Sequence, residues 1–265
     1  MIAAAERAQV TLMVAYNKRY DPAYRRFAEE TRRLPDIRLA RITTLEAPLV
    51  PYVAHYRLHQ PGALPHAVQA AFATDNAARI AAAIGEVDPL SAHTYRLVLL
   101  DSLVHEFNAV RGVLGEPDQL AFADITEHGV TAVLRFGAAH CVLNWVDLPG
   151  IARYAMEFAF YAPQSRLTLA FPSPFLRSAP TLLTREGGEP DTTRSWQTEE
   201  ITAYDESFRE ELIHFHACVT SGRAPITSAA DALHDIALCQ SVIDVHRRRA
   251  SRDHPSAFAS PPTQA

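Results

Sequence analysis

The chain has 265 residues, of which 48% are hydrophobic, and it carries a formal net charge of −5 at pH 7. This apolar content is enough for a substantial core in one large domain or two small ones. The acidic balance, with no basic run interleaved with aromatics, argues against a nucleic-acid partner. No apolar run approaches about 18 residues and no signal-peptide pattern opens the chain, which argues against a membrane-bound or exported protein.

The cysteines indicate a reducing compartment. Cys141, Cys218 and Cys239 lie far apart and form no Cys-x-x-Cys pair. We therefore expect neither a disulfide framework nor a zinc site, and we expect the protein to be cytoplasmic.

The first part of the chain predicts a helix, an apolar strand over residues 11–16, and a turn. Lys18, the only lysine, and Arg19 come directly after this strand, at the end where α/β proteins place ligand groups. Lys18 could supply a cation to a site, and a buried lysine can act as an acid or a base. The alternative is a solvated turn in which Arg19 pairs with Asp21.

A second strand and a proline-rich segment follow. Residues 23–33 predict a short charged helix, and residues 37–46 alternate apolar and polar side chains as a half-buried strand does. Residues 47–65 contain four prolines and predict a loop, and the alanine-rich residues 67–84 predict a helix. We interpret this region as an insertion or a lid over the sheet.

The proline-rich loop carries two kinds of candidate ligand. His55 and His59 have the spacing of a helical metal pair, but no Glu or Cys nearby offers a third ligand, so we expect no metal site. Tyr56 and Arg57 lie between them, and Tyr56 is a candidate for a substrate contact from the lid.

Residues 96–115 read as a helix of about five turns. Asp101 and His105 are four residues apart and therefore share one face of this helix, with Asn108 nearby. A carboxylate beside an imidazole can move a proton near neutral pH. The alternative is a histidine that is hydrogen-bonded to Asp101 for structure alone.

Residues 119–196 predict a run of β-strands. Connections of two to five residues, as at 127–129 and 137–139, favour antiparallel hairpins over parallel crossovers. The predicted strands are 120–127, 129–136, 140–146, 154–161, 166–171 and 181–185. Trp145, near a strand end, could stack on a sugar ring or pack in the core.

Two helices and a tail close the chain. Residues 208–222 have apolar side chains at helical spacing, and Ser228-x-x-Asp231 is a capping box that opens a helix to about residue 248. The inward stripe expected for that helix is Leu233, Ile236, Ala237, Gln240 and Ile243. Residues 251–265 contain three prolines and predict a disordered tail.

Helices before and after a run of antiparallel strands predict an α+β fold, in which a large, mostly antiparallel sheet has helices on one face. An apolar second face of such a sheet often pairs with a copy of itself. We therefore expect a homo-oligomer, a dimer through the sheet face.

Several short motifs occur in an order that resembles the Gfo/Idh/MocA family, which includes glucose–fructose oxidoreductase and inositol dehydrogenase. They are Tyr-Asn-Lys-Arg-Tyr-x-Pro at 16–22, Asp-x-x-x-His at 101–105 followed by Gly-Glu-Pro at 115–117, and Ala-Pro-Ile-Thr at 224–227 after the helix at 208–222. The resemblance covers roughly residues 1–248, with a poor match over 48–92.

The resemblance implies an oxidoreductase that acts on a sugar, a polyol or a similar small molecule. His105 would donate or accept the proton at the substrate oxygen, and Asp101 would orient the substrate or tune His105. Lys18 could supply the cation that a catalytic lysine provides in the family. The candidate substrate contacts are Arg19, Asn108, Tyr56 and Trp145. Family members also dimerise through the sheet.

The sequence departs from the family in its nucleotide-binding part. Family members begin with a Rossmann domain that binds NAD or NADP and carries a Glu-Lys-Pro near its end. Here no G-x-G-x-x-G follows a strand and no Glu-Lys-Pro occurs. We interpret residues 1–22 as the last helix and strand of that domain, 23–250 as a substrate-binding and dimerisation domain, and 251–265 as the tail.

We accordingly expect no coenzyme to bind this chain as given, and NAD or NADP to bind if a nucleotide domain is supplied. A misplaced start codon or a split gene would explain the difference. Two other functions remain open: a cofactor-independent isomerase, epimerase or lyase that uses Asp101, His105 and Lys18, and a non-catalytic binding or regulatory subunit. A filled space around Asp101, without a cavity, would favour the last of these.

Overall fold

The computed structural model describes residues 1–59 and 62–251. Apart from Ser251, the predicted disordered tail lies outside the described residues. The centre of the structure is a sheet of eight strands in the order β2-β3-β4-β1-β5-β6-β7-β8. The strands are β1 (Leu39–Glu46), β2 (Gln119–Thr126), β3 (Gly129–Phe136), β4 (Ala139–Asp147), β5 (Ala155–Ala162), β6 (Ser165–Phe171), β7 (Leu182–Gly188) and β8 (Ser195–Ile201).

The predicted antiparallel hairpins are confirmed, and one pair of strands is parallel. β1 precedes all other strands in the chain but lies between β4 and β5, parallel to the first and antiparallel to the second. Sequence patterns missed β8, because this edge strand pairs with β7 alone and nearly all its residues are exposed. It therefore lacks the apolar alternation that marks a half-buried strand.

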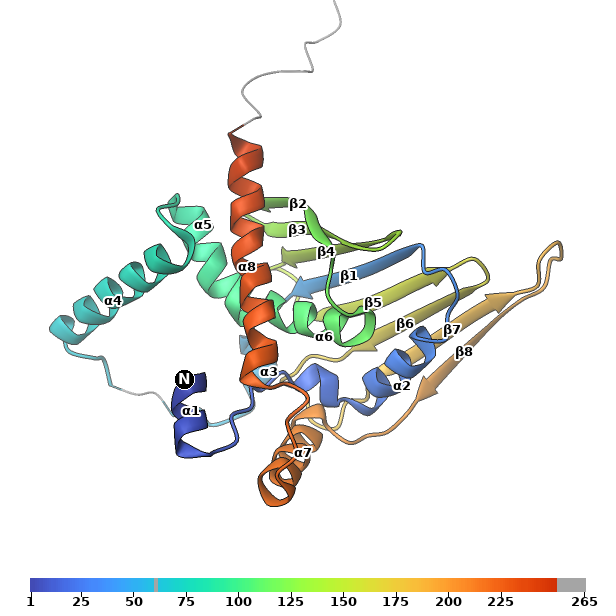
Figure 1. Ribbon diagram of the computed structural model, residues 1–265, viewed down its shortest axis with the longest axis horizontal. Coiled ribbons are helices and arrows are strands. Elements are labelled where there is room, and N and C mark those ends of the chain that lie inside the picture. The colour runs from blue at the N-terminus through green and yellow to red at the C-terminus, as the bar shows by residue number, and fades with distance from the viewer. Residues whose placement is uncertain (60–61, 252–265) are drawn as a thin grey trace, which may run out of the picture.

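Helices cover one face of the sheet (Figure 1), as the α+β interpretation predicts. The helical segments are α1 (Ile2–Ala8), the 3₁₀ turn η1 (Asn17–Tyr20), α2 (Pro22–Thr31), α3 (Val50–Val53), α4 (His66–Ile84), α5 (Pro89–Thr94), the π-helical η2 (Tyr95–Leu103), α6 (Val104–Leu114), α7 (Ser207–Ser221) and α8 (Ala229–Ala250). None of the described helices has both the length and the apolar character that crossing a bilayer requires.

Aromatic packing joins the helices to the sheet. The rings of Phe27 on α2 and Phe160 on β5 lie 5.0 Å apart, and both side chains are fully buried. Burial of one such side chain contributes about 2–3 kcal/mol to stability. At the edge of this core, Arg185 on β7 donates to both carboxylate oxygens of Glu30 on α2, at 2.6 and 2.7 Å. These contacts fix α2, and with it the turn that precedes it.

The strand predicted over residues 11–16 does not form. The segment makes one isolated bridge, between Met13 and Ser228, and α1 before it buries no side chain. A strand is stable only when neighbouring strands accept its backbone hydrogen bonds. The described residues offer this segment no sheet edge beyond that bridge, so the apolar pattern alone was misleading.

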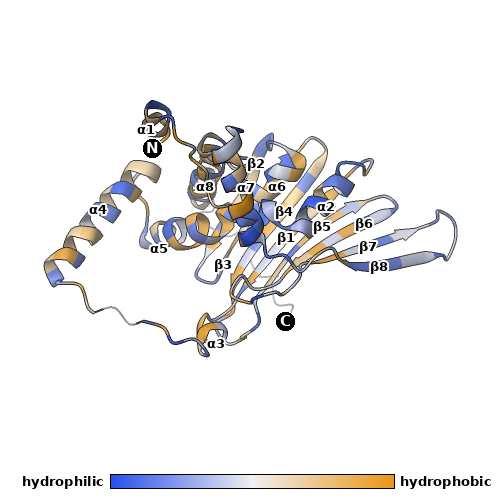
Figure 2. Ribbon diagram, turned by 90° about the horizontal axis from the view of Figure 1, so that it is seen from below, coloured by the Kyte–Doolittle hydropathy of each residue, from blue (hydrophilic) through white to orange (hydrophobic). Residues whose placement is uncertain are grey.

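The lid interpretation of residues 47–84 is also wrong for its helix. In Figure 2, α4 lies to the side of the sheet and does not cover it. Of its 19 residues, only Ile84 at its end is buried. An alanine-rich helix has little apolar surface with which to pack on a sheet, so α4 touches the body mainly where it meets α8.

The second face of the sheet is more polar than expected. Arg41 on β1 pairs with Glu157 on β5, and Arg166 on β6 donates to Glu186 on β7 at 2.6 Å. Such cross-strand pairs stabilise a solvated sheet face. The premise of a continuous apolar second face is therefore not met, and pairing of two chains through it stays a prediction.

The inward face of α8 differs from the predicted stripe. Of the predicted stripe, Ile243 is fully buried and Ile236 packs against the core, but Leu233 is 57% exposed. The other buried side chains of the helix are Ala232, Asp235, Cys239 and Val242. The charged Asp235 takes an inward position because partners on α6 satisfy its carboxylate. Periodicity alone assigns such a residue to the solvent.

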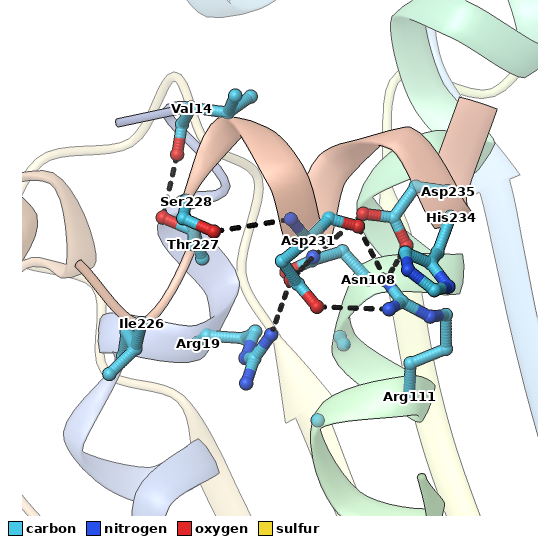
Figure 3. A network of polar contacts seen from close by, with 12 residues as sticks. Val14, Arg19, Asn108, Arg111, Ile226, Thr227, Ser228, Asp231, His234 and Asp235 are labelled. Carbon is cyan, nitrogen blue, oxygen red and sulfur yellow. Dashed lines mark hydrogen bonds and ion pairs between the residues drawn. The ribbon is translucent and has the colours of Figure 1, made fainter. Parts of the chain in front are cut away.

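These partners belong to a buried network of ionic contacts (Figure 3). Arg111 on α6, whose side chain is 3% exposed, donates to Asp235 at 2.6 Å and to Asp231 at 2.9 Å. Asn108 donates to Asp235 at 2.8 Å. Asp231 in turn accepts from Arg19 at 3.0 Å, so the network joins η1, α6 and the first turn of α8.

We expect removal of Asp235 to destabilise the fold strongly. Asp235→Ala removes the one fully buried carboxylate that Arg111 and Asn108 contact and leaves them only the more exposed Asp231 and Glu116, which should cost about 3 kcal/mol. The control is His234→Ala, because His234 is the neighbouring residue and its side chain is 58% exposed; its cost should stay within about 1 kcal/mol. Urea unfolding of both variants measures the difference, and equal losses would show that the network is not essential.

Candidate active site

A cavity of about 780 Å³ lies between the sheet and the helices and brings four of the predicted site residues together. Asp101 and His105 come from η2 and α6, Lys18 from η1, and Tyr56 from the loop after α3. Glu46 at the end of β1 and Tyr154 just before β5 complete its wall. The helix predicted over residues 96–115 and the turn that carries Lys18 thus meet at this cavity.

Asp101 lies in a π-helical segment. The helix predicted over residues 96–115 begins earlier, at Pro89, where Asp88 caps its N-terminus by accepting from the amide of Ser91 at 3.0 Å. Residues 95–103 are π-helical before the α-helix resumes. The wider π turn is common at functional sites because it changes the direction in which side chains point. Asp101 and His105 both line the cavity although no hydrogen bond joins them.

His105 is held as a neutral imidazole. Its pKa is lowered from 6.5 to about 4, mainly by burial and also by the nearby charge of Lys18, whereas Asp101 opposes both effects. The ring packs edge-on against Tyr16 with 5.5 Å between ring centres. Its Nδ1 atom is buried and has no hydrogen-bond partner among the described residues.

Lys18 is buried, with 7% of its surface exposed. The solvated-turn alternative is therefore wrong, and so is the pair expected between Arg19 and Asp21. Arg19 binds Asp231 instead. Asp21 caps α2 by accepting from the amide of Ala23 at 2.8 Å, and it accepts from the hydroxyl of Thr181 at 2.6 Å.

Two carboxyl groups at the cavity were missed by sequence analysis: the buried Glu106 and the half-buried Glu46. Glu106 is fully buried; it accepts a hydrogen bond from Thr44 at 2.6 Å, and its Oε2 has no partner among the described residues. Burial raises its pKa to about 7 against the opposing effects of Thr44 and Lys18. Burial likewise raises the pKa of Glu46. The sequence did hold a signal for Glu106: it is an acidic residue on a helix between the apolar residues Val104 and Phe107, a position typical of a buried carboxyl group.

Two other residues of the wall gave no signal in the sequence. Tyr154 lines the cavity, and burial raises the pKa of its phenol well above 10, so it is a hydrogen-bond donor at neutral pH. Arg177, in the segment between β6 and β7, reaches the cavity from the opposite side. Both lie far from Asp101 in the chain, and only the fold brings them near.

Three predicted substrate contacts lie outside the cavity wall. Asn108 is fully buried and donates both to Asp231, at 3.2 Å, and to Asp235. Arg19 belongs to the same network, and Trp145 packs against the core. None of the three lines the cavity. The donor groups of Asn108 and Arg19 bind protein carboxylates, so these two side chains are held in the structural network.

The described residues contain no group of three or more His, Cys, Asp or Glu side chains placed to hold a metal ion. The described residues before η1 also do not fit a dinucleotide bound in the Rossmann manner. Binding of a pyrophosphate in the Rossmann manner needs a glycine-rich turn between a strand and a helix, whereas the segment before η1 contains one short exposed helix and one bridge.

Comparisons with known proteins identify the fold. The sequence matches no protein-family model and no curated protein. Solved structures do match. One is a dehydrogenase from Chromobacterium violaceum, which superposes with a TM-score of 0.62 at 12% sequence identity. The match covers 95% of this chain and 66% of that chain. The fold is that of the C-terminal part of Gfo/Idh/MocA-type oxidoreductases.

Two further Gfo/Idh/MocA-type structures support this. The 3-ketoreductase KijD10 from Actinomadura kijaniata, in complex with NADP and TDP-benzene, gives a TM-score of 0.61 at 16% identity and covers 92% of this chain and 65% of its own. The aldose-aldose oxidoreductase from Caulobacter crescentus, complexed with glycerol, gives a TM-score of 0.61 at 17% identity; the match covers 94% of this chain and 65% of that chain. At these identities the likeness establishes the fold. This chain spans slightly less than two thirds of the length of each.

The pKa of His105 makes a testable contribution to stability. Between pH 6.5 and 4 the unfolded state binds a proton at His105 that the folded state does not, so acidification over this range favours unfolding. Wild type should lose as much as about 3 kcal/mol relative to His105→Gln. Glu106 acts in the opposite direction between pH 7 and 4.5 because its folded pKa is raised, but it is present in both proteins and cancels from the difference.

Urea unfolding at pH 6.5 and at pH 4 measures this effect. The matched control is His128→Gln in the exposed turn between β2 and β3. A stability difference between wild type and His105→Gln that is the same at both pH values would contradict the neutral state of His105.

Proposed function

We propose that this chain is the substrate-binding domain of an oxidoreductase that acts on a sugar, a polyol or a similar small hydroxy or carbonyl compound. The observation that carries the proposal is the cavity of about 780 Å³, which gathers Asp101, His105 and Lys18 within a fold shared with oxidoreductases. A space of this volume accommodates a small organic ligand. The cavity also speaks against a purely structural role.

The residues suit proton transfer to or from a substrate oxygen. His105, neutral at physiological pH, can accept a proton or a hydrogen bond from a hydroxyl group. The carboxylate of Asp101 would stabilise the imidazolium that results, because it already favours the charged form of His105. Lys18 and Tyr154 can donate hydrogen bonds to neighbouring oxygens of the same ligand, and Tyr56 can contact it at the mouth of the cavity.

We propose that the nicotinamide coenzyme, NAD or NADP, is bound by polypeptide outside this chain. Two observations support this: the segment before η1 lacks a phosphate-binding turn, and the chain spans 65% of KijD10, a protein solved in complex with NADP. We further propose a cytoplasmic protein, since its three cysteines are free and buried, and a homodimer formed through the sheet face that carries no helices.

A second function is favoured by the cluster of buried titratable groups. Lys18, Glu106 and His105 influence one another electrostatically, and such clusters support acid–base chemistry without a coenzyme. The chain would then be an isomerase, an epimerase or a lyase. The second function predicts that carbon-bound hydrogen of a ligand exchanges with D₂O when no nucleotide is present. The first function predicts no such exchange.

We expect the purified chain to bind small polyhydroxylated compounds. Glycerol, glyceraldehyde and a panel of aldoses and polyols should raise the melting temperature, because a ligand at about 100 times its Kd stabilises the fold by about 2.7 kcal/mol. Asp101→Asn should weaken binding by about tenfold or more, as expected for the loss of a charged hydrogen-bond acceptor. His128→Asn is the control that should bind normally, and a panel without any stabilising ligand would contradict the proposal.

We expect the purified chain not to bind NADH or NADPH, so that their fluorescence is unchanged on addition of protein. We also expect the neighbouring DNA, in frame or in an adjacent gene, to encode a strand, a G-x-G-x-x-G turn, a helix and a Glu-Lys-Pro. Tight NADH binding by the chain alone would contradict this part of the proposal. Substrate turnover without any nucleotide would favour the second function.

A further inference from the structure

The amine of Lys18 is an unusual group in this cavity because it has no polar partner. Lys18 is more than nine-tenths buried, and it lines both the cavity and a smaller hollow beside it. Its Nζ atom lies 4.7 Å above the centre of the Phe171 ring. Within residues 1–59 and 62–251 the Nζ atom makes no hydrogen bond or ion pair. A structural lysine at such depth is normally paired.

The groups around Lys18 do not compensate for its burial. Glu106 on α6, Asp21 at the start of α2 and Glu46 at the end of β1 favour the ammonium form, whereas burial has the larger effect and lowers its pKa. The carboxyl of Glu106 is itself protonated in part near pH 7, which weakens its support for the cation. An amine in this position can lose its proton far more readily than a lysine in water.

We propose that Lys18 is a nucleophile that forms an imine with the carbonyl carbon of an aldehyde or a ketone bound in the cavity. The inference rests on the proposed function in one respect, namely that a small hydroxy or carbonyl compound occupies this space. It goes further by naming a carbonyl compound as the ligand and a covalent bond as the mode of binding. The warrant is the position of an unpartnered, buried amine on the wall of a ligand-sized cavity.

The step balances without an oxidant or a reductant. The lone pair of Nζ attacks the carbonyl carbon and forms a C–N bond, the C=O electron pair moves to oxygen, and one N–H proton is transferred to that oxygen. The carbinolamine then loses water: the C–O bond breaks, the nitrogen lone pair forms C=N, and the second N–H proton leaves in the water. His105 and Tyr154, in the same wall, are placed to carry these protons.

The composition of the chain makes the test sharp. Lys18 is the only lysine, so the chain has one side-chain amine besides its α-amino group. The protein is incubated at pH 7 with glyceraldehyde and sodium cyanoborohydride, which at this pH reduces an imine to a stable secondary amine in preference to the free aldehyde. Peptide mapping by mass spectrometry then assigns the adduct. We expect it on Lys18, formed at least about tenfold faster than on N-acetyl-lysine amide. An adduct at the α-amino group alone would overturn the proposal.

Two controls separate this inference from the proposed function. Lys18→Arg keeps a cation and should lose the internal adduct while it retains the α-amino adduct; the assignment by peptide mapping of wild type does not depend on whether that variant folds. Glycerol has no carbonyl group and should slow the labelling of Lys18 by occupying the cavity. If polyols stabilise the protein and Lys18 is never labelled, the imine is refuted and the proposed function stands. If Lys18 is labelled and no polyol binds, the proposed function is contradicted and the imine at Lys18 is supported.

Discussion

The ion pairs of the buried Arg111 guanidinium with Asp231 and Asp235 are the interactions on which the site depends. Through Asp235 and Asp231 the guanidinium joins α6 to α8, and Asp231 also holds Arg19, which lies 212 positions away in the chain. Removing such charges from water costs several kcal/mol per ion, and only good geometry on every side offsets this cost. The relative positions of Lys18 and His105 are a consequence, because each lies on an element that the network fixes.

The polar groups near the site divide into two kinds. The donor groups of Arg19, Asn108 and Arg111 bind protein carboxylates and hold the structure together. By contrast, Nδ1 of His105 and Oε2 of Glu106 are buried without a partner in the described part of the chain, and the buried amine of Lys18 contacts only the ring of Phe171. Each unsatisfied group costs about 1–3 kcal/mol. Their concentration around one cavity separates groups that support the fold from groups that can act on a ligand.

The fold gathers titratable side chains around one cavity. The sheet and its covering helices build the cavity, the π turn directs Asp101 into it, and burial sets the proton affinities of His105 and Glu106. Phosphate binding requires a different device, a glycine-rich turn at the start of a helix. None of the described elements that form this cavity presents such a turn.

The sequence by itself determined the α+β fold and the hairpins, and it singled out Asp101, His105 and Lys18, which the structure brings to one cavity, because hydrophobic period, short connections and motif order are local properties. It failed where partners distant in the chain decide the outcome. Residues 11–16 form no strand for lack of neighbours, and Asp235 faces inward because Arg111 meets it. Asn108 proved to be part of the structural network, and Glu106, Tyr154 and Arg177 joined the site only through the fold. The sequence left Lys18 open between a site cation and a solvated turn residue, and only the fold shows that its amine is buried, since desolvation is a property of the tertiary structure alone.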